Sequence, residues 1–280
     1  MEILELINNG SKELKNKNIY THMLDSEILL SEVLNKTREE LLVNLTEKVG
    51  QSKVEKFNNL ITRRSLKEPI AYILNRKEFW SRSFLVNSNT LIPRPETELM
   101  VEKILEVVKK KSVFILDIGT GSGCILLSLL IELKNSKGIG IDKSSKAIQM
   151  AYKNSKKLRL TQRAKFYTRP LNEFYNNKFD LIVSNPPYIM RKEVKNLSED
   201  IKKFEPKLAL DGGNDGLDVI KKVIYKSKDI LKIKGMLALE IGNEQFKKVS
   251  KILKENKFKT RFLVKDYRKN IRCIMSTLEK

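Results

Sequence analysis

Two short segments of the sequence carry residue types that could do chemistry. The first is Asp117-Ile118-Gly119-Thr120-Gly121-Ser122-Gly123, which separates a predicted buried strand from a predicted helix. Glycines let the backbone turn tightly and approach a ligand closely, and a helix N-terminus adds free N–H groups. The spacing G-x-G-x-G differs from the G-x-G-x-x-G of dinucleotide folds, and no Lys-Ser or Lys-Thr follows, which excludes a Walker loop.

An acidic residue follows this glycine run at the end of the next predicted strand. Asp142 lies 25 residues after Asp117, where a carboxylate suits two hydrogen bonds to ribose hydroxyls. A simpler interpretation makes both aspartates helix caps and the glycines a tight turn. The combination of strand, glycine run, helix, strand and acid favours a nucleoside cofactor. The candidate cofactor-binding residues are Asp117, Gly119, Thr120, Gly121, Ser122, Gly123 and Asp142.

The second segment is Asn185-Pro186-Pro187-Tyr188, which follows the buried strand predicted at 179–183 and Ser184. The prolines fix φ and remove two backbone donors, so nearby carbonyls point outward with little local competition. Asn185 adds an acceptor oxygen, and Tyr188 adds a flat apolar wall with a polar tip. This set suits a planar, conjugated NH2 group whose two hydrogens are held by two acceptors. The alternative is a rigid turn, but strand ends are where parallel sheets bind ligands.

Alternating strands and helices must position both segments. Helices are predicted at 96–110, 124–133, 145–156, 217–231 and 244–256, and strands at 112–117, 138–142, 164–168, 179–183, 235–241, 260–265 and 271–277. This alternation is typical of an α/β fold with a mostly parallel sheet covered on both faces. The last two strands leave no room for a crossover helix, so we expect them to pair antiparallel.

The first 75 residues predict a separate bundle of four or five short helices. Asp25 is a plausible N-cap, while Thr37-Arg38-Glu39-Glu40 and Ser52-Lys53-Val54-Glu55 have the pattern of capping boxes. Apolar residues flanking the polar turn 81–83 indicate a β-hairpin connector over 76–92. The predicted domains are therefore 1–75, 76–92 and 93–280.

The amino-acid composition excludes several kinds of protein and of functional site. Two cysteines, Cys124 and Cys273, and one histidine, His22, exclude a disulfide framework and a cysteine or histidine-rich metal site. The start has no secretory pattern, and the longest apolar stretch, 124–133, is far shorter than the ~20 residues of a membrane span. We expect a cytoplasmic protein without metal. Its 55 Lys+Arg against 34 Asp+Glu give a net charge of +21, which fits either a polyanionic partner or a Lys-rich composition.

The two chemical segments together resemble S-adenosylmethionine-dependent methyltransferases that modify amino groups of planar systems. The chain most closely resembles the peptide chain release factor N5-glutamine methyltransferases of the HemK/PrmC type. Further marks of this resemblance are Glu68–Ile73, Glu78-Phe79-Trp80, Leu91–Glu98, Glu205-Pro206, Ala209-Leu210, Gly212-Gly213, Asp215-Gly216-Leu217 and Leu239-Glu240-Ile241-Gly242. The run Ile92-Pro93-Arg94-Pro95-Glu96-Thr97-Glu98 discriminates best.

The resemblance implies a seven-stranded Rossmann-like class I methyltransferase domain preceded by a small helical substrate-recognition domain. It implies S-adenosylmethionine as cofactor and the glutamine of the Gly-Gly-Gln motif in class 1 release factors as substrate. Asn185, Pro186, Pro187 and Tyr188 match the family's catalytic site, and Asn185 also adjoins the cofactor. One departure is Arg169-Pro170, where the family often has Asp and an aromatic residue near the adenine ring.

Two other functions compete with this one. Adenine also presents a planar conjugated NH2 group, so an N6-adenine methyltransferase acting on DNA or RNA is the main alternative. A non-catalytic cofactor-binding or scaffold protein is the second. The roles of Arg94, Glu96 and Glu98 stay open between anchoring the hairpin and contacting substrate. We expect a monomer that needs neither a membrane nor an obligatory nucleic acid.

Overall fold

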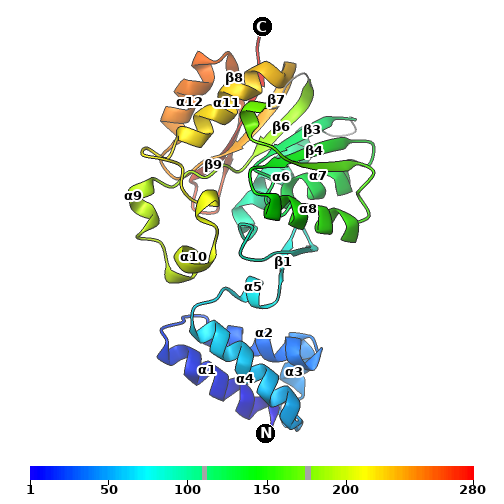
Figure 1. Ribbon diagram of the computed structural model, residues 1–280, viewed down its shortest axis with the longest axis vertical. Helices are drawn as coiled ribbons and strands as arrows, with labels where there is room; N and C mark the ends of the chain where they lie inside the picture. Colours follow the sequence, from blue (N-terminus) through cyan, green and yellow to red (C-terminus); the bar gives the residue numbers. More distant parts are fainter. Residues whose placement is uncertain (109–111, 174–177) are drawn as a thin grey trace. The chain divides into compact units, whose positions relative to one another are not determined.

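The computed structural model describes residues 1–108, 112–173 and 178–280, with the Asn172 side chain left out (Figure 1). The end of the predicted helix 96–110 and the lysine cluster 109–111 lie outside the described residues. The chain divides into two compact units. One comprises Met1–Asn75 with Ser198–Phe204, and the other Arg76–Leu197 with Glu205–Lys280.

The first unit is a bundle of short helices with its own apolar core. Its helices are α1 (Ile3–Asn16), α2 (His22–Leu34), α3 (Arg38–Val43), α4 (Gln51–Ser65), α5 (Ile70–Ile73) and α10 (Glu199–Phe204). Leu29, Leu30 and Phe57 are almost fully buried in the core. Gly10 lets α1 approach its neighbours, because a Cβ there would lie 2.6 Å from the Ser26 hydroxyl and 2.8 Å from the Phe57 ring.

The predicted helix starts in this bundle are partly right. At Thr37 the capping box is confirmed, with hydrogen bonds of 3.2 Å and 2.7 Å to the backbone and side chain of Glu40. The box at Ser52 is wrong, because α4 begins at Gln51 after Gly50 and has no side-chain cap. The aspartate cap is also wrong, since Asp25 lies inside α2. Its buried carboxylate accepts a hydrogen bond of 2.7 Å from Arg64 instead.

The connector is an antiparallel hairpin of β1 (Arg76–Phe79) and β2 (Arg82–Leu85). Its turn is Trp80-Ser81, one residue earlier than predicted, and both residues have positive φ of 52° and 51°. Two-residue turns of this kind match the twist of the strands. Glu98 accepts the Trp80 backbone N–H at 3.1 Å, so this glutamate anchors the hairpin.

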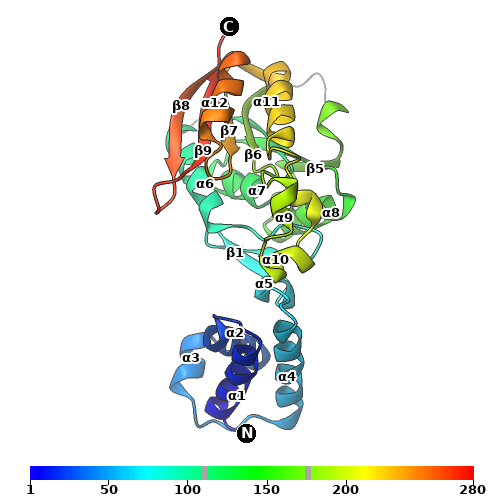
Figure 2. The same ribbon diagram turned by 90° about the vertical axis from the view of Figure 1, so that its left-hand side faces the viewer.

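A seven-stranded sheet forms the centre of the second unit, in the order β5-β4-β3-β6-β7-β9-β8. The strands are β3 (Phe114–Ile118), β4 (Lys137–Asp142), β5 (Ala164–Thr168), β6 (Phe179–Ser184), β7 (Leu231–Glu240), β8 (Phe258–Lys265) and β9 (Ile271–Leu278). Strands β3 to β7 are parallel, whereas β9 pairs antiparallel with both β7 and β8. Figure 2 shows β8 at one edge of the sheet. The α/β fold and the antiparallel closing pair are confirmed.

Helices cover both faces of this sheet, as predicted. They are α6 (Pro95–Val108), α7 (Cys124–Glu132), α8 (Ser145–Lys157), α11 (Asp218–Ile230) and α12 (Phe246–Glu255). The short helix α9 (Arg191–Val194) has no buried residues, and 3-10 turns lie at Leu171–Glu173 and Lys207–Ala209. Successive residues of β3 point to opposite faces. Ile115 packs with the core under α6 and α7, and Leu116 packs with the core under α11 and α12. Figures 1 and 2 show these two pairs of helices on opposite sides of the sheet.

The strand order places the two chemical segments together. Strand β3 lies between β4 and β6, and Ile118 is in register with Ile141 on one side and Ser184 on the other. The glycine run, Asp142 and Asn185 therefore follow neighbouring strand ends. Strand order reverses at this point, which is where open α/β sheets bind ligands. Among the described residues, no helix is long and apolar enough to cross a membrane.

Candidate active site

The glycine run forms an open loop between β3 and α7. Gly119, Gly121 and Gly123 have φ of 73°, 55° and 79°, a region that side chains other than glycine rarely adopt. A Cβ at Gly119 or Gly121 would meet no atom within 4 Å, so the space beside the loop is open. The backbone N–H groups of Gly119 and Thr120 donate to the Ile141 carbonyl at 2.9 Å and 3.0 Å. The loop is thus fixed to β4 and can receive a ligand against its backbone.

Asp117 lies fully buried under this loop. Its Oδ2 accepts the Thr120 hydroxyl at 2.7 Å, while Oδ1 has no hydrogen bond of ordinary geometry in the described part of the chain. Burial raises the pKa of Asp117 to about 7, against the opposing effect of the Thr120 hydrogen bond. A buried acceptor without a donor is costly. A ligand that donates a hydrogen bond here would remove that cost.

Asp142 ends β4 and holds the rim of the loop. Its Oδ2 accepts the Gly121 N–H at 3.0 Å, and its Oδ1 accepts the Ser144 N–H at 2.9 Å. Burial raises the pKa of Asp142, and these backbone hydrogen bonds oppose the shift. A carboxylate has about four lone-pair positions. The Lys143 N–H is a third backbone donor to this carboxylate. Acceptor capacity still remains for a ribose hydroxyl, so the residues present fit a nucleoside.

The segment after β5 lies beside this acid. The Arg169 N–H donates to the Asp142 carbonyl at 3.0 Å, and the Arg169 guanidinium lies 6.0 Å from the centre of the Tyr167 ring. Leu171 begins a 3-10 turn and packs against the core under α11 and α12. The segment Arg169-Pro170, which departs from the family pattern, is thus joined to the candidate ribose site by a backbone hydrogen bond.

Asn185 is the first residue of the second chemical segment and follows β6 directly. Its Nδ2 donates to the Thr97 hydroxyl at 3.3 Å, and that hydroxyl donates to Glu240 Oε2 at 2.7 Å. Thr97 lies in the first turn of α6, and Glu240 is the last residue of β7. Because the nitrogen is engaged by Thr97, the Asn185 oxygen faces away from this pair.

Close backbone packing shapes the rest of the Asn185–Tyr188 corner. Gln245 donates to the Tyr188 carbonyl at 3.0 Å and accepts the Gly242 N–H at 2.9 Å. A Cβ at Gly212 would lie 2.7 Å from the Pro187 carbonyl oxygen, and one at Gly216 would lie 2.5 Å from the Tyr188 carbonyl oxygen. These two glycines therefore allow the corner to sit directly on neighbouring backbone. Burial raises the pKa of the Tyr188 phenol to about 12, so it stays neutral.

No sequence pattern predicts the roles of Thr97, Glu240 and Gln245. Thr97 and Glu240 lie within runs that mark the family resemblance, and Gln245 lies in none of them. Arg94, whose role was open, pairs with Glu205 at 2.6 Å, and Glu96 is exposed on α6. The two cysteines are free and buried. Burial raises the pKa of the Cys124 thiol to about 12 and also raises that of Cys273, so neither is a nucleophile.

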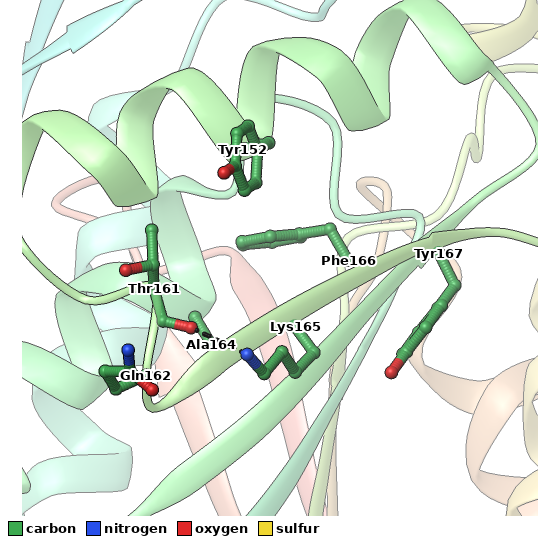
Figure 3. Close-up of a pocket in the computed structure, with 7 residues that line it drawn as sticks. All are labelled: Tyr152, Thr161, Gln162, Ala164, Lys165, Phe166 and Tyr167. Carbon is green, nitrogen blue, oxygen red and sulfur yellow. Dashed lines mark hydrogen bonds between the residues drawn. The ribbon is translucent and has the colours of Figure 1, made fainter.

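A surface pocket of about 350 Å³ lies along the edge strand β5 (Figure 3). It is lined by Tyr152 from α8 and by Thr161, Gln162, Ala164, Lys165, Phe166 and Tyr167. None of these belongs to the glycine run or to the Asn185–Tyr188 corner. In the ranges that the structure describes, no group of three or more His, Cys, Asp or Glu side chains could hold a metal ion.

The sheet order, the open glycine loop and the acid at the next strand end together define a class I S-adenosylmethionine-dependent methyltransferase. A family model described as "Methyltransferase domain" matches residues 109–278. The fold is shared with a solved methyltransferase from Pyrococcus furiosus, with a TM-score of 0.54, 14% identity, and coverage of 70% of this chain and 89% of that one.

More similar relatives identify the family within this class. A family model described as "PrmC N-terminal domain" matches residues 5–74. The release factor glutamine methyltransferase of Buchnera aphidicola subsp. Schizaphis graminum is 46% identical over 72% of this chain and 73% of that protein. The enzyme of the same name from Caulobacter vibrioides is 37% identical over 75% and 73%. The chain belongs to the release factor glutamine methyltransferases.

Proposed function

We propose that this enzyme transfers a methyl group from S-adenosylmethionine to the side-chain amide nitrogen, N5, of the glutamine in the Gly-Gly-Gln motif of class 1 release factors. Membership of the family supports the reaction and its substrate class. The observation that carries the assignment to the site is the hydrogen bond of Asn185 Nδ2 to Thr97. It leaves an amide oxygen at the end of β6 to accept a hydrogen from a substrate NH2 group.

Positioning is the main task of the catalytic residues. An amide nitrogen is a weak nucleophile because its lone pair is delocalised into the carbonyl, while bound S-adenosylmethionine supplies a strongly electrophilic sulfonium methyl. We assign Asn185 Oδ1 and the Pro186 carbonyl as acceptors of the two amide hydrogens, with Pro187 fixing the corner and Tyr188 packing against the amide plane. These acceptors align the nitrogen and stabilise the positive charge that develops on it.

We assign cofactor binding to the loop between β3 and α7 and to Asp142. The backbone from Gly119 to Gly123, with Thr120 and Ser122, would hold the amino-acid part beside Asp117. Asp142 would accept a hydrogen bond from the ribose hydroxyls with its remaining acceptor capacity. The segment Arg169-Pro170-Leu171 would then flank the adenine ring, because its backbone is hydrogen bonded to Asp142.

The remaining assignments concern domains and partners. We propose that residues 1–75 recognise the release factor and that residues 93–280 catalyse the methyl transfer. Residues 76–92 connect these two domains. The match of residues 5–74 to the PrmC N-terminal domain supports a separate domain in this part of the chain. We also propose a monomer that needs no nucleic acid. Sedimentation of the enzyme, and activity after nuclease treatment, test these two points.

The experiment that tests the function is mass spectrometry of a release factor after incubation with enzyme and S-adenosylmethionine. We expect one added methyl group on the Gly-Gly-Gln glutamine and none when that glutamine is replaced by Glu. DNA and RNA incubated in parallel test the N6-adenine alternative, which the family relationship does not favour. Methyl incorporation into nucleic acid alone would overturn the proposal.

A further inference from the structure

We propose that Thr97 and Glu240 are positioning residues that fix which end of the Asn185 amide faces the substrate. The inference deepens the proposed function and rests on it. It starts from the chain of hydrogen bonds that joins the three side chains, at 3.3 Å and 2.7 Å. Thr97 lies in α6, Asn185 directly follows β6 and Glu240 ends β7, so the fold assembles the arrangement from three separate segments.

The direction of these hydrogen bonds follows from chemistry. An ionised carboxylate only accepts hydrogen bonds, so Thr97 must direct its single hydroxyl hydrogen to Glu240. The Thr97 oxygen can then only accept, and the side of Asn185 that faces it must be the NH2 group. The amide oxygen is thereby directed away from Thr97. The ionised carboxylate thus selects the amide orientation in which an acceptor is presented.

Burial makes this selection effective. Thr97 is 2% exposed and Glu240 3% exposed, so water does not replace either partner. Asn185 is half-buried, and no described residue donates a hydrogen bond to its oxygen. An amide that was free to turn over would present NH2 to the substrate for part of the time. Two NH2 groups facing each other repel, and the substrate would then lose one of its two acceptors.

Removing only the Thr97 hydroxyl tests the proposal. Thr97→Val keeps the shape and volume of the side chain, and Thr97→Ser keeps the hydroxyl but loses a methyl group. Ser155→Ala is the matched control, since it removes a buried hydroxyl that bonds the Tyr152 carbonyl within α8 at 2.8 Å. Each variant is assayed on a release factor at about pH 8, above the pKa of about 7 to which burial raises Glu240. Cofactor affinity is measured by calorimetry and thermal stability by melting.

We expect Thr97→Val to lower kcat by about tenfold or more, since misorientation of one positioning group has effects of this size. Its affinity for S-adenosylmethionine should change less than twofold, and its melting temperature should fall no more than that of Ser155→Ala. Thr97→Ser should recover most of the lost kcat. Glu240→Gln should also lower kcat, because an amide can offer Thr97 either a donor or an acceptor and no longer dictates the direction.

Three results would overturn the inference. They are a Thr97→Val enzyme with wild-type kcat, a Thr97→Ser enzyme as impaired as Thr97→Val, and a kcat loss accompanied by an equal loss of cofactor affinity. Failure of the proposed function is distinguishable, because the wild-type enzyme would then methylate no glutamine in the same assay. The inference about orientation fails only when the wild-type enzyme is active and the variants do not separate as described.

Discussion

Arg94 and Glu205 form an ion pair of 2.6 Å across 111 residues of sequence. The Glu205 side chain is only 1% exposed, and its second oxygen also accepts the Ile92 N–H at 3.4 Å. The pair therefore fixes the segment that precedes α6 against the chain that follows α10. Thr97 lies close by, in the first turn of α6. A buried carboxylate of this kind is stabilised by its cation, so removing Arg94 takes away a charged partner in a place that water cannot reach.

Replacing Arg94 should destabilise the protein more than replacing an exposed arginine. We expect Arg94→Met to lower the free energy of unfolding by about 3 kcal/mol, the lower end of the range for a broken buried pair, since Arg94 itself is 30% exposed. The matched control is Arg191→Met, whose 65% exposed side chain pairs with Asp211 and should contribute much less to stability, because water screens an exposed ion pair. Urea unfolding measures both, and equal losses would contradict the prediction.

Loss of the Asn185 side chain should separate binding from turnover. We expect Asn185→Ala to lower kcat by about 10²–10³-fold, since an acceptor aimed at developing charge acts mainly in the transition state. The cofactor loop is held by β4 and should keep its affinity for S-adenosylmethionine. Calorimetry and methylation kinetics on the release factor measure the two quantities. Full activity in this variant would remove Asn185 from the mechanism.

Replacing Asp142 should weaken cofactor binding more than it lowers turnover. Asp142→Ala removes the acceptors offered to the ribose and also the contacts to the Gly121 and Ser144 N–H groups. Hydrogen bonds to a charged group contribute about 1.5–3 kcal/mol each. We therefore expect the dissociation constant for S-adenosylmethionine to rise at least tenfold, with a smaller change in kcat at saturating cofactor. An unchanged dissociation constant in calorimetry would place the ribose elsewhere.

The backbone packing of the corner can be tested through Gly216. This residue has φ of 72°, and a Cβ on it would lie 2.5 Å from the Tyr188 carbonyl oxygen and 2.8 Å from Gln245 Nε2. Gly216→Ala should therefore displace Tyr188 and lower kcat by about tenfold or more. Gly50→Ala is the control, since a Cβ there meets nothing within 4 Å. Comparable kinetics in the two variants would show that the corner tolerates movement.

The sequence allowed the prediction of whole elements and of contiguous motifs. Apolar runs predicted buried strands at 112–117 and 179–183, and the strands lie at Phe114–Ile118 and Phe179–Ser184. The order of such runs predicted the α/β fold. Boundaries were less accurate where one pattern continued into the next. Leu231 completes the apolar face of the predicted helix 217–231, yet it is the first residue of β7. The strand therefore begins four residues before the predicted Gly235.

Partners from distant segments could not be predicted in this way. Asp142 and Asn185 stand at strand ends, where the fold class alone suggests a role. Thr97 and Glu240 have no local pattern that relates them, because their contact forms only when α6 packs beside the end of β7. Likewise, Asp25 is a residue type that is common at helix N-caps. Only the position of α4 shows that Arg64 donates a hydrogen bond to its carboxylate instead. The roles of these residues therefore depend on hydrogen bonds between segments that are distant in sequence.

The buried acid Glu240 should make stability depend on pH. Burial, reinforced by the charge of Glu96, raises its pKa from 4.5 to about 7, while the Thr97 hydrogen bond and the charges of Arg272 and Arg94 act in the opposite direction. The folded protein thus holds this proton more tightly than the unfolded chain. Its contribution to stability is fully present below about pH 4.5 and is lost as the pH rises through about 7.

Glu240→Gln removes this titration. It should therefore stabilise the folded protein at higher pH, whereas most mutations destabilise. The glutamine variant carries no buried charge, so its melting temperature relative to wild type should rise between about pH 5 and about pH 8 and then stay level. The other groups near Glu240, including the Tyr188 phenol and the Cys273 thiol, are present in both proteins, so their effects cancel. Asp117→Asn, measured without cofactor, should show the same sign, because burial also raises the pKa of Asp117 to about 7. A difference in melting temperature that is constant across this range would show that Glu240 titrates at its ordinary pKa in the folded protein. Lower kcat combined with higher stability in Glu240→Gln would show that the enzyme keeps a destabilising charge because the reaction uses it.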